Sequence, residues 1–124
     1  MKLLQVREQN VKRLQVELAN KLKKQRWFAD REISIEQESA RLEEESKEVR
    51  LKGAILRIRQ IDAFLDDLAR AHEAMSQKKF ELSHEIVVLQ RKLEEAIKER
   101  KMVEKLEELH YNQRLQKRRR RGES

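Results

Sequence analysis

Apolar residues recur every seven positions through the second half of the chain. One uninterrupted series comprises Ile61, Leu68, Met75, Leu82, Leu89, Ala96 and Val103. A companion series, three residues earlier in each repeat, comprises Ile58, Leu65, His72, Lys79, Ile86, Leu93 and Arg100. Two series with this offset form one narrow stripe along an α-helix, which is the pattern of a coiled-coil strand. We therefore predict a helix here whose apolar stripe is covered by a partner helix.

The first half of the chain carries a second heptad pattern. One of its series comprises Arg7, Leu14, Lys21, Phe28, Ile35, Leu42 and Val49. The companion series begins apolar and then turns polar, in the order Leu4, Val11, Leu18, Gln25, Glu32, Ser39 and Ser46. Polar residues at a coiled-coil seam fix the register at a cost in stability. Since most of these polar residues face an apolar one, we expect the middle of the pairing to be weaker than its ends.

The boundary between the two patterns is at Gly53, the only glycine outside the C-terminal tail. A glycine can adopt positive φ at a helix end, which makes it the strongest stop signal in this sequence. We predict one helix over residues 2–51, a turn at 52–53, a second helix over 54–118 and a frayed basic C-terminus. One glycine costs a helix only about 1 kcal/mol, so a single continuous helix is an alternative.

Matching the two patterns against each other favours a hairpin. Folding the chain between Gly53 and Ala54 opposes residues whose numbers add to 107. The layers are then Val49 with Ile58, Leu42 with Leu65, Leu18 with Leu89, Leu14 with Leu93, Val11 with Ala96, and Leu4 with Val103. We predict an all-α fold, a long antiparallel two-helix coiled-coil hairpin that forms a single domain over residues 1–124. The main alternative is a helix or hairpin that dimerises.

One layer of this register opposes two like charges, Arg7 and Arg100. Long arginine side chains can keep their stems on the apolar stripe while their charged heads turn outward. We therefore expect this layer to be tolerated without contributing to stability.

Composition agrees with long helices that each bury one stripe. Of the 124 residues, 43% are charged and 38% are hydrophobic, with no cysteine or proline. Such a chain cannot fill a thick globular core, and the periodic spacing of its apolar residues argues against disorder. No apolar run approaches the roughly 20 residues of a membrane span. We expect a cytoplasmic protein.

The sequence offers no pattern typical of catalysis. His72, His84 and His110 are too far apart along the chain to share a metal on one helix turn. We expect no enzymatic activity, no metal site and no cofactor. The run Lys117–Arg121 could attract phosphates, but no base-reading motif accompanies it, so we expect no specific nucleic-acid binding.

Two groups of apolar residues are candidates for binding partners. Phe64, Leu68 and Ala71 form a row at the edge of the seam with i, i+4, i+7 spacing, although Leu68 is also a seam residue. Beyond about residue 106 the second helix has no partner within the hairpin. Leu109 and Leu115 would then lie on a single helix that another protein stabilises, or one that frays.

Three segments resemble the FliJ family of flagellar export proteins, which has counterparts in injectisomes. Residues 99–108, ERKMVEKLEE, are similar to the family's signature near the end of its second helix. Arg7-Glu8-Gln9 followed by Glu17-Leu18-Ala19 resembles the opening of many members, and Phe64, Leu68 and Ala71 resemble the patch for the export-gate membrane protein. The turn at Gly53 is shorter than in some relatives, and nothing in the family matches Lys117–Arg121.

The resemblance implies a stalk like the central shaft of rotary ATPases. Its partners would be a hexameric export ATPase, the export-gate membrane protein and, as a further candidate, export chaperones, at the cytoplasmic side of the inner membrane. By this resemblance Val103, Leu106 and Leu109 would face the ATPase, while Phe64, Leu68 and Ala71 would face the gate. Two alternatives remain, a structural coiled-coil adaptor and a basic hairpin that binds nucleic acid non-specifically.

Overall fold

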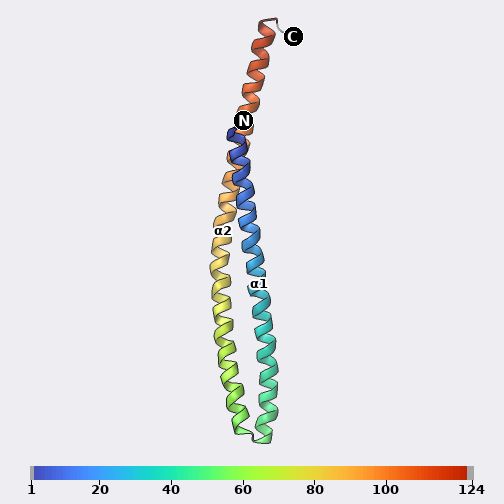
Figure 1. Ribbon diagram of the computed structural model, residues 1–124, viewed down its shortest axis with the longest axis vertical. Coiled ribbons are helices and arrows are strands. Elements are labelled where there is room, and N and C mark those ends of the chain that lie inside the picture. Colours follow the sequence, from blue (N-terminus) through green and yellow to red (C-terminus); the bar gives the residue numbers. More distant parts are fainter. Residues whose placement is uncertain (1, 123–124) are drawn as a thin grey trace. The chain divides into compact units, whose positions relative to one another are not determined.

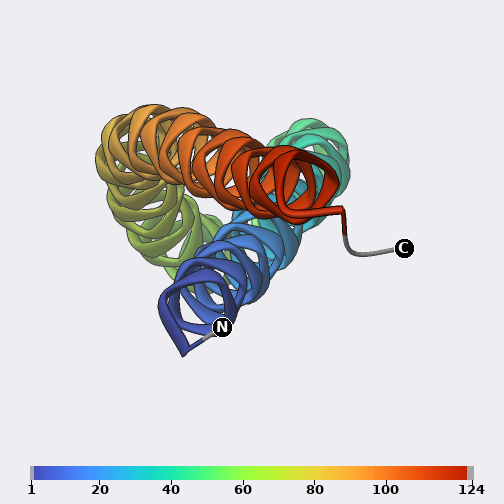
Figure 2. The same ribbon diagram turned by 90° about the horizontal axis from the view of Figure 1, so that it is seen from above.

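The chain forms two α-helices that pack against each other in antiparallel directions (Figure 1). In the computed structural model, which describes residues 2–122, helix α1 spans Lys2–Lys52 and helix α2 spans Ile55–Arg120. The predicted all-α helical hairpin is confirmed, and each helix end lies within two residues of its predicted position. Seen from above in Figure 2, the described residues form these two helices and no strand.

Gly53 ends α1 in a Schellman motif. Its φ is 71°, in the left-handed region that a residue with a side chain adopts only with strain. The Gly53 amide donates a hydrogen bond to the Arg50 carbonyl at 3.2 Å, and the Ala54 amide donates to the Val49 carbonyl at 3.4 Å. These two bonds satisfy carbonyls that would otherwise have no partner at the helix end. The chain then reverses, and α2 begins at Ile55.

The C-terminal end of α2 uses the same chemistry. Gly122 has a φ of 72°, and its amide donates to the Arg119 carbonyl at 3.1 Å. The last turn of α2 is wholly basic, which complements the partial negative charge of a helix C-terminus. The helix therefore reaches Arg120, two residues beyond the predicted end. Of the tail predicted to fray, Glu123 and Ser124 lie outside the described residues.

The chain separates into two compact units. The turn unit comprises Asn20–Ile86, and the terminal unit combines Met1–Ala19 with Val87–Ser124. In both units, every predicted seam residue of α1 and α2 is buried or half-buried. The heptad patterns therefore identified the packed face of each helix correctly.

Cross-helix contacts confirm the predicted register within each unit. In the turn unit, Glu36 contacts His72, and Gln25 hydrogen-bonds Ser83. In the terminal unit, Arg7 contacts Glu99. These pairs have residue numbers that add to 106 or 108, next to the predicted 107. An axial slip would take the apolar layers of the two helices out of alignment, so the packing of the seam helps to maintain this register.

The turn unit is held by a single row of buried side chains. Its two most completely buried residues are Ile61, 0% exposed, and Ile35, 2% exposed. The other buried members are Phe28, Leu42, Ser46, Leu82 and Ile86. Ser46 satisfies its hydroxyl by accepting a hydrogen bond from Arg50 Nε at 3.3 Å. In a two-helix fold, the apolar surface that stabilises the folded state is limited to the one stripe that each helix buries.

The terminal unit has its own apolar cluster. Its buried residues Val11, Leu14, Leu89 and Ala96 pack with the half-buried Leu18, Leu93 and Ile97. Next to this cluster, the two opposed arginines are half-buried, and Nε of each is buried without a hydrogen-bond partner among the described residues. Arg7 Nη1 pairs with Glu99 at 2.7 Å, and Arg100 Nε lies 3.8 Å from Glu104 of its own helix. Each guanidinium thereby gains a carboxylate in place of the facing charge.

Neither helix contains a segment long and apolar enough to cross a lipid bilayer within the part of the chain that the structure describes.

Two isoleucines of α1 test the seam directly. Ile35 is 2% exposed, whereas Ile33, two residues away on the same helix, is 52% exposed. We predict that Ile35→Ala lowers the free energy of unfolding by about 2–4 kcal/mol, because it removes fully buried methyl groups. Ile33→Ala, the matched control, should change it by less than about 0.5 kcal/mol. Chemical denaturation followed by circular dichroism measures both; equal losses would contradict the predicted seam.

Candidate functional site

Polar side chains interrupt the seam over much of the turn unit, and most of them have partners. Gln25 Nε2 donates to Ser83 Oγ at 2.9 Å, and Lys79 Nζ lies 3.3 Å from Glu32 Oε1. We expected such residues to gain little from the facing helix, and the structure gives each of these positions a polar partner there. Their side chains reach diagonally to a neighbouring polar group, although an apolar residue lies directly opposite.

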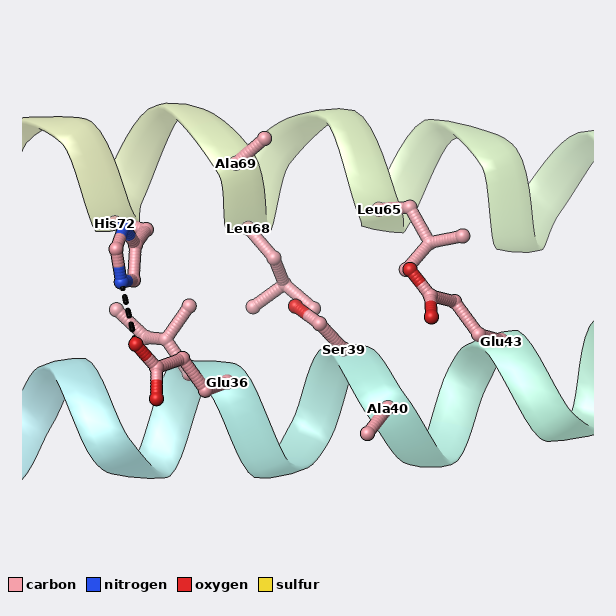
Figure 3. Close-up of a pocket in the computed structure, with 9 residues that line it drawn as sticks. Glu36, Ser39, Ala40, Glu43, Leu65, Leu68, Ala69 and His72 are labelled. Carbon is pink, nitrogen blue, oxygen red and sulfur yellow. Dashed lines mark hydrogen bonds and ion pairs between the residues drawn. The ribbon is translucent and has the colours of Figure 1, made fainter.

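Three potential ligands for a metal ion meet at this polar centre. Glu32 and Glu36 lie one turn apart on α1, and His72 faces them from α2 (Figure 3 shows the Glu36–His72 contact). His72 Nε2 lies 3.0 Å from Glu36 Oε1 and 4.0 Å from the Glu32 carboxylate. The sequence prediction considered only the three histidines and missed this combination. The register could have revealed it, since it places residue 72 next to residue 36.

A shallow groove of about 460 Å³ adjoins this cluster. Figure 3 shows Leu65 and Leu68 of α2 directed toward α1, where Ser39 and Ala40 provide only small side chains. Small residues at a seam leave space that larger apolar residues would fill. The groove is therefore a place where the two stripes do not fill the space between them.

The residues predicted to face the export gate differ in their exposure. Phe64 is 54% exposed. Leu68 and Ala71 are half-buried, and Leu68 lines the groove between the helices. Phe64 is thus the member of this row that another protein can contact most fully.

The residues predicted to face the ATPase also separate into two kinds. Val103 is buried, at 8% exposure, and belongs to the seam of the terminal unit. Leu106 and Leu109 are 52% and 56% exposed. In the observed register Lys2 lies opposite about residue 105, so α2 continues to Arg120 without an α1 residue beside it in the described chain (Figure 1).

Other large apolar side chains are exposed away from these positions. They are Trp27, Phe80, Val87, Val88, Met102 and Tyr111. Some have local contacts: the Trp27 ring packs edge-on against Phe28 at 5.1 Å, and Phe80 against His84 at 5.2 Å. Such exposed residues are ordinary on protein surfaces, so their presence does not by itself define a site.

One ion pair of the turn unit lowers the pKa of a glutamate. Lys21 Nζ lies 2.8 Å from Glu85 Oε2. The hydrogen bond from the Lys21 ammonium, followed by the positive charge of Lys21, lowers the pKa of Glu85, and Lys24 adds a smaller effect. The charged form of this carboxylate is therefore favoured in the folded chain.

Comparison of the chain with family models, with curated proteins and with solved structures finds no match.

The Lys21–Glu85 pair predicts a pH-dependent contribution to stability. Because the pKa of Glu85 is lowered on folding, its contribution is present above the unfolded-state pKa and is lost as the pH falls through the folded-state value. We predict that Glu85→Gln destabilises the chain at neutral pH and that this difference disappears in acid. The measurement is thermal unfolding at a series of pH values. In a Lys21→Gln background, the effect of Glu85→Gln at neutral pH should be strongly reduced; an undiminished effect would contradict the assignment.

Proposed function

We propose that this protein is a coiled-coil stalk of a flagellar or injectisome export apparatus, which links a hexameric export ATPase to the export-gate membrane protein. The observation that carries the proposal is the run of exposed apolar residues on α2 beyond the start of α1. It begins within residues 99–108, the segment whose sequence resembles the FliJ signature. The protein would act at the cytoplasmic side of the membrane as a mechanical and binding component, without catalysing a reaction itself.

The ATPase contact is assigned to the free end of α2. From Glu104 to Arg120 this helix is exposed, apart from the half-buried Glu107 and Leu115. Met102, Leu106 and Leu109 follow each other at i, i+4, i+7, so they lie on one face of the helix. All three are more than half exposed. An apolar helical face of this kind suits a groove on another protein.

The paired part of the hairpin supports the same proposal. A stalk must keep its helices in register while a partner acts on one end. The signature segment is anchored by Val103, which is buried, and by Arg100, which is half-buried at the seam. Leu106 lies three residues after Val103, so it is next to the packed seam on the helix surface, and the packing fixes the direction in which it points. This supports Leu106 and Leu109 as contacts and limits Val103 to a structural part.

The gate contact is assigned to the turn unit. Phe64 is an exposed aromatic residue on α2, and exposed aromatic residues are frequent anchors of protein interfaces. Leu68 and Ala71 lie on the same side of the helix and are half-buried. They would form the base of a patch of which Phe64 is the projecting part. Export chaperones are a further class of partner, without a residue assigned to them.

The ATPase assignment predicts a specific loss of function. We expect the double variant Leu106→Ala/Leu109→Ala to weaken binding to a purified hexameric export ATPase by about tenfold, and to reduce stimulation of ATP hydrolysis accordingly. Leu51→Ala/Leu56→Ala is the matched control, because these two leucines are also exposed, at 90% and 77%, but lie at the hairpin turn. The control should bind and stimulate normally.

Two results would contradict this assignment. One is full stimulation by the Leu106→Ala/Leu109→Ala variant. The other is a wild-type chain that neither binds nor stimulates the ATPase and instead forms a stable homodimer, as a structural adaptor would.

The gate assignment predicts a separate effect. Phe64→Ala should reduce capture of the cytoplasmic domain of the export-gate protein by about tenfold, while leaving ATPase stimulation unchanged. Phe80→Ala is the control, since Phe80 is also on α2 and is 66% exposed. A pull-down in which Phe64→Ala retains full gate binding would count against this site.

A further inference from the structure

We propose that Glu32, Glu36 and His72 bind one divalent transition-metal ion of the zinc class, which joins the two helices in the middle of the turn unit. The proposal does not depend on the export function. It rests on three ligand groups from two helices that already lie close together. The ion would act as a removable clamp at the place where the seam is most polar.

The distances suit a small ion. The three ligand atoms lie within 4.8 Å of one another. In a tetrahedral zinc site with bonds of about 2.0–2.1 Å, neighbouring ligand atoms are roughly 3.3 Å apart. His72 Nε2 and Glu36 Oε1, at 3.0 Å, already have nearly this separation. The Glu32 carboxylate lies 4.0 Å from the same nitrogen and within 4.8 Å of the Glu36 ligand atom, so it needs to move by up to about 1.5 Å, which a side-chain rotation can provide.

The kinds of ligand favour zinc over magnesium or calcium. One imidazole nitrogen and two carboxylate oxygens form a set that zinc accepts, with water completing the fourth position. Magnesium and calcium prefer oxygen ligands throughout and gain little from an imidazole. The site should therefore distinguish zinc from magnesium.

The backbone holds these groups in place. Glu32 and Glu36 are four residues apart on α1, so their side chains lie on the same face. His72 comes from α2, across the seam. An ion bound by all three would link positions 36 residues or more apart in the sequence. Since the unfolded chain does not hold these groups together, binding should stabilise the folded hairpin.

Lys79 is the competitor for this site. The Glu32 side chain is only 12% exposed, so its charge requires a cation nearby. Lys79 provides that cation, with Nζ 3.3 Å from Glu32 Oε1 and 3.4 Å from Oε2. Its side chain is 39% exposed and can turn toward water when a metal ion takes its place. Removing Lys79 should therefore tighten metal binding, which an unspecific surface histidine would not show.

The test is calorimetric titration of zinc chloride into the full chain, together with thermal unfolding with and without zinc. We expect one ion per chain and a higher melting temperature with zinc but not with magnesium. Glu36→Gln and His72→Gln should each weaken binding by at least about tenfold and remove most of the shift in melting temperature. Glu36 is 62% exposed, so Glu36→Gln should fold even if His72→Gln does not. His110→Gln, which removes a histidine outside the cluster, is the matched control and should bind as wild type does.

The variant Lys79→Gln decides whether the ion replaces the lysine. We expect it to tighten zinc binding by about threefold or more, because it removes a competing cation and a repulsive charge. Unchanged or weaker binding in this variant would overturn the proposed geometry. The proposal as a whole would be overturned by a wild-type chain that binds no zinc, by equal binding in Glu36→Gln, or by an equal effect of magnesium.

Discussion

The structure depends on one interaction, the apolar seam between α1 and α2. A two-helix fold has no further layer, so each helix can bury only one stripe and everything else faces water. Ile61, 0% exposed, and Val11, 1% exposed, represent that stripe in the turn unit and the terminal unit. The same constraint means that apolar residues on the surface are not explained by packing within the hairpin. A large apolar residue outside the stripe has no core to enter, as Phe64 and Leu109 show.

Polar residues within the seam have a different consequence. Where Leu or Ile would give the strongest pairing, the chain has Glu32, Ser39 and His72. The ion pair of Glu32 with Lys79 and the contact of His72 with Glu36 recover part of the lost stability and specify the register. The seam is thus apolar in each unit but least so in the middle of the turn unit. The proposed ATPase contact and the proposed metal site both lie where the stripe is incomplete or has no partner helix.

Much of the fold could be predicted, because heptad spacing and a single internal glycine determine it. The phase of the pattern identified buried residues such as Ile35, and Gly53 marked the turn that its positive φ now explains. Side-chain contacts could not be predicted in the same way, since a register gives facing positions but not the direction in which long side chains reach. Val103 shows the limit for the candidate sites: the heptad pattern placed it on the seam, and its 8% exposure removes it from any free surface. Whether Phe64 or Leu106 binds a partner depends on that partner, which this chain's sequence does not describe.

The central claim is that the two heptad stripes pair with each other within one chain. Because the chain has no cysteine, single cysteines placed at the exposed positions Gln37 and Arg70 can carry a pair of spin labels without interference. These positions lie at the same level of the two helices in the observed register, each on the outward face of its helix. Pulsed dipolar spectroscopy should give one short distance that persists when the labelled chain is diluted with unlabelled chain. A continuous helix would separate the labels by roughly 50 Å, and a distance that disappears on dilution would show pairing between chains; either result would contradict the hairpin.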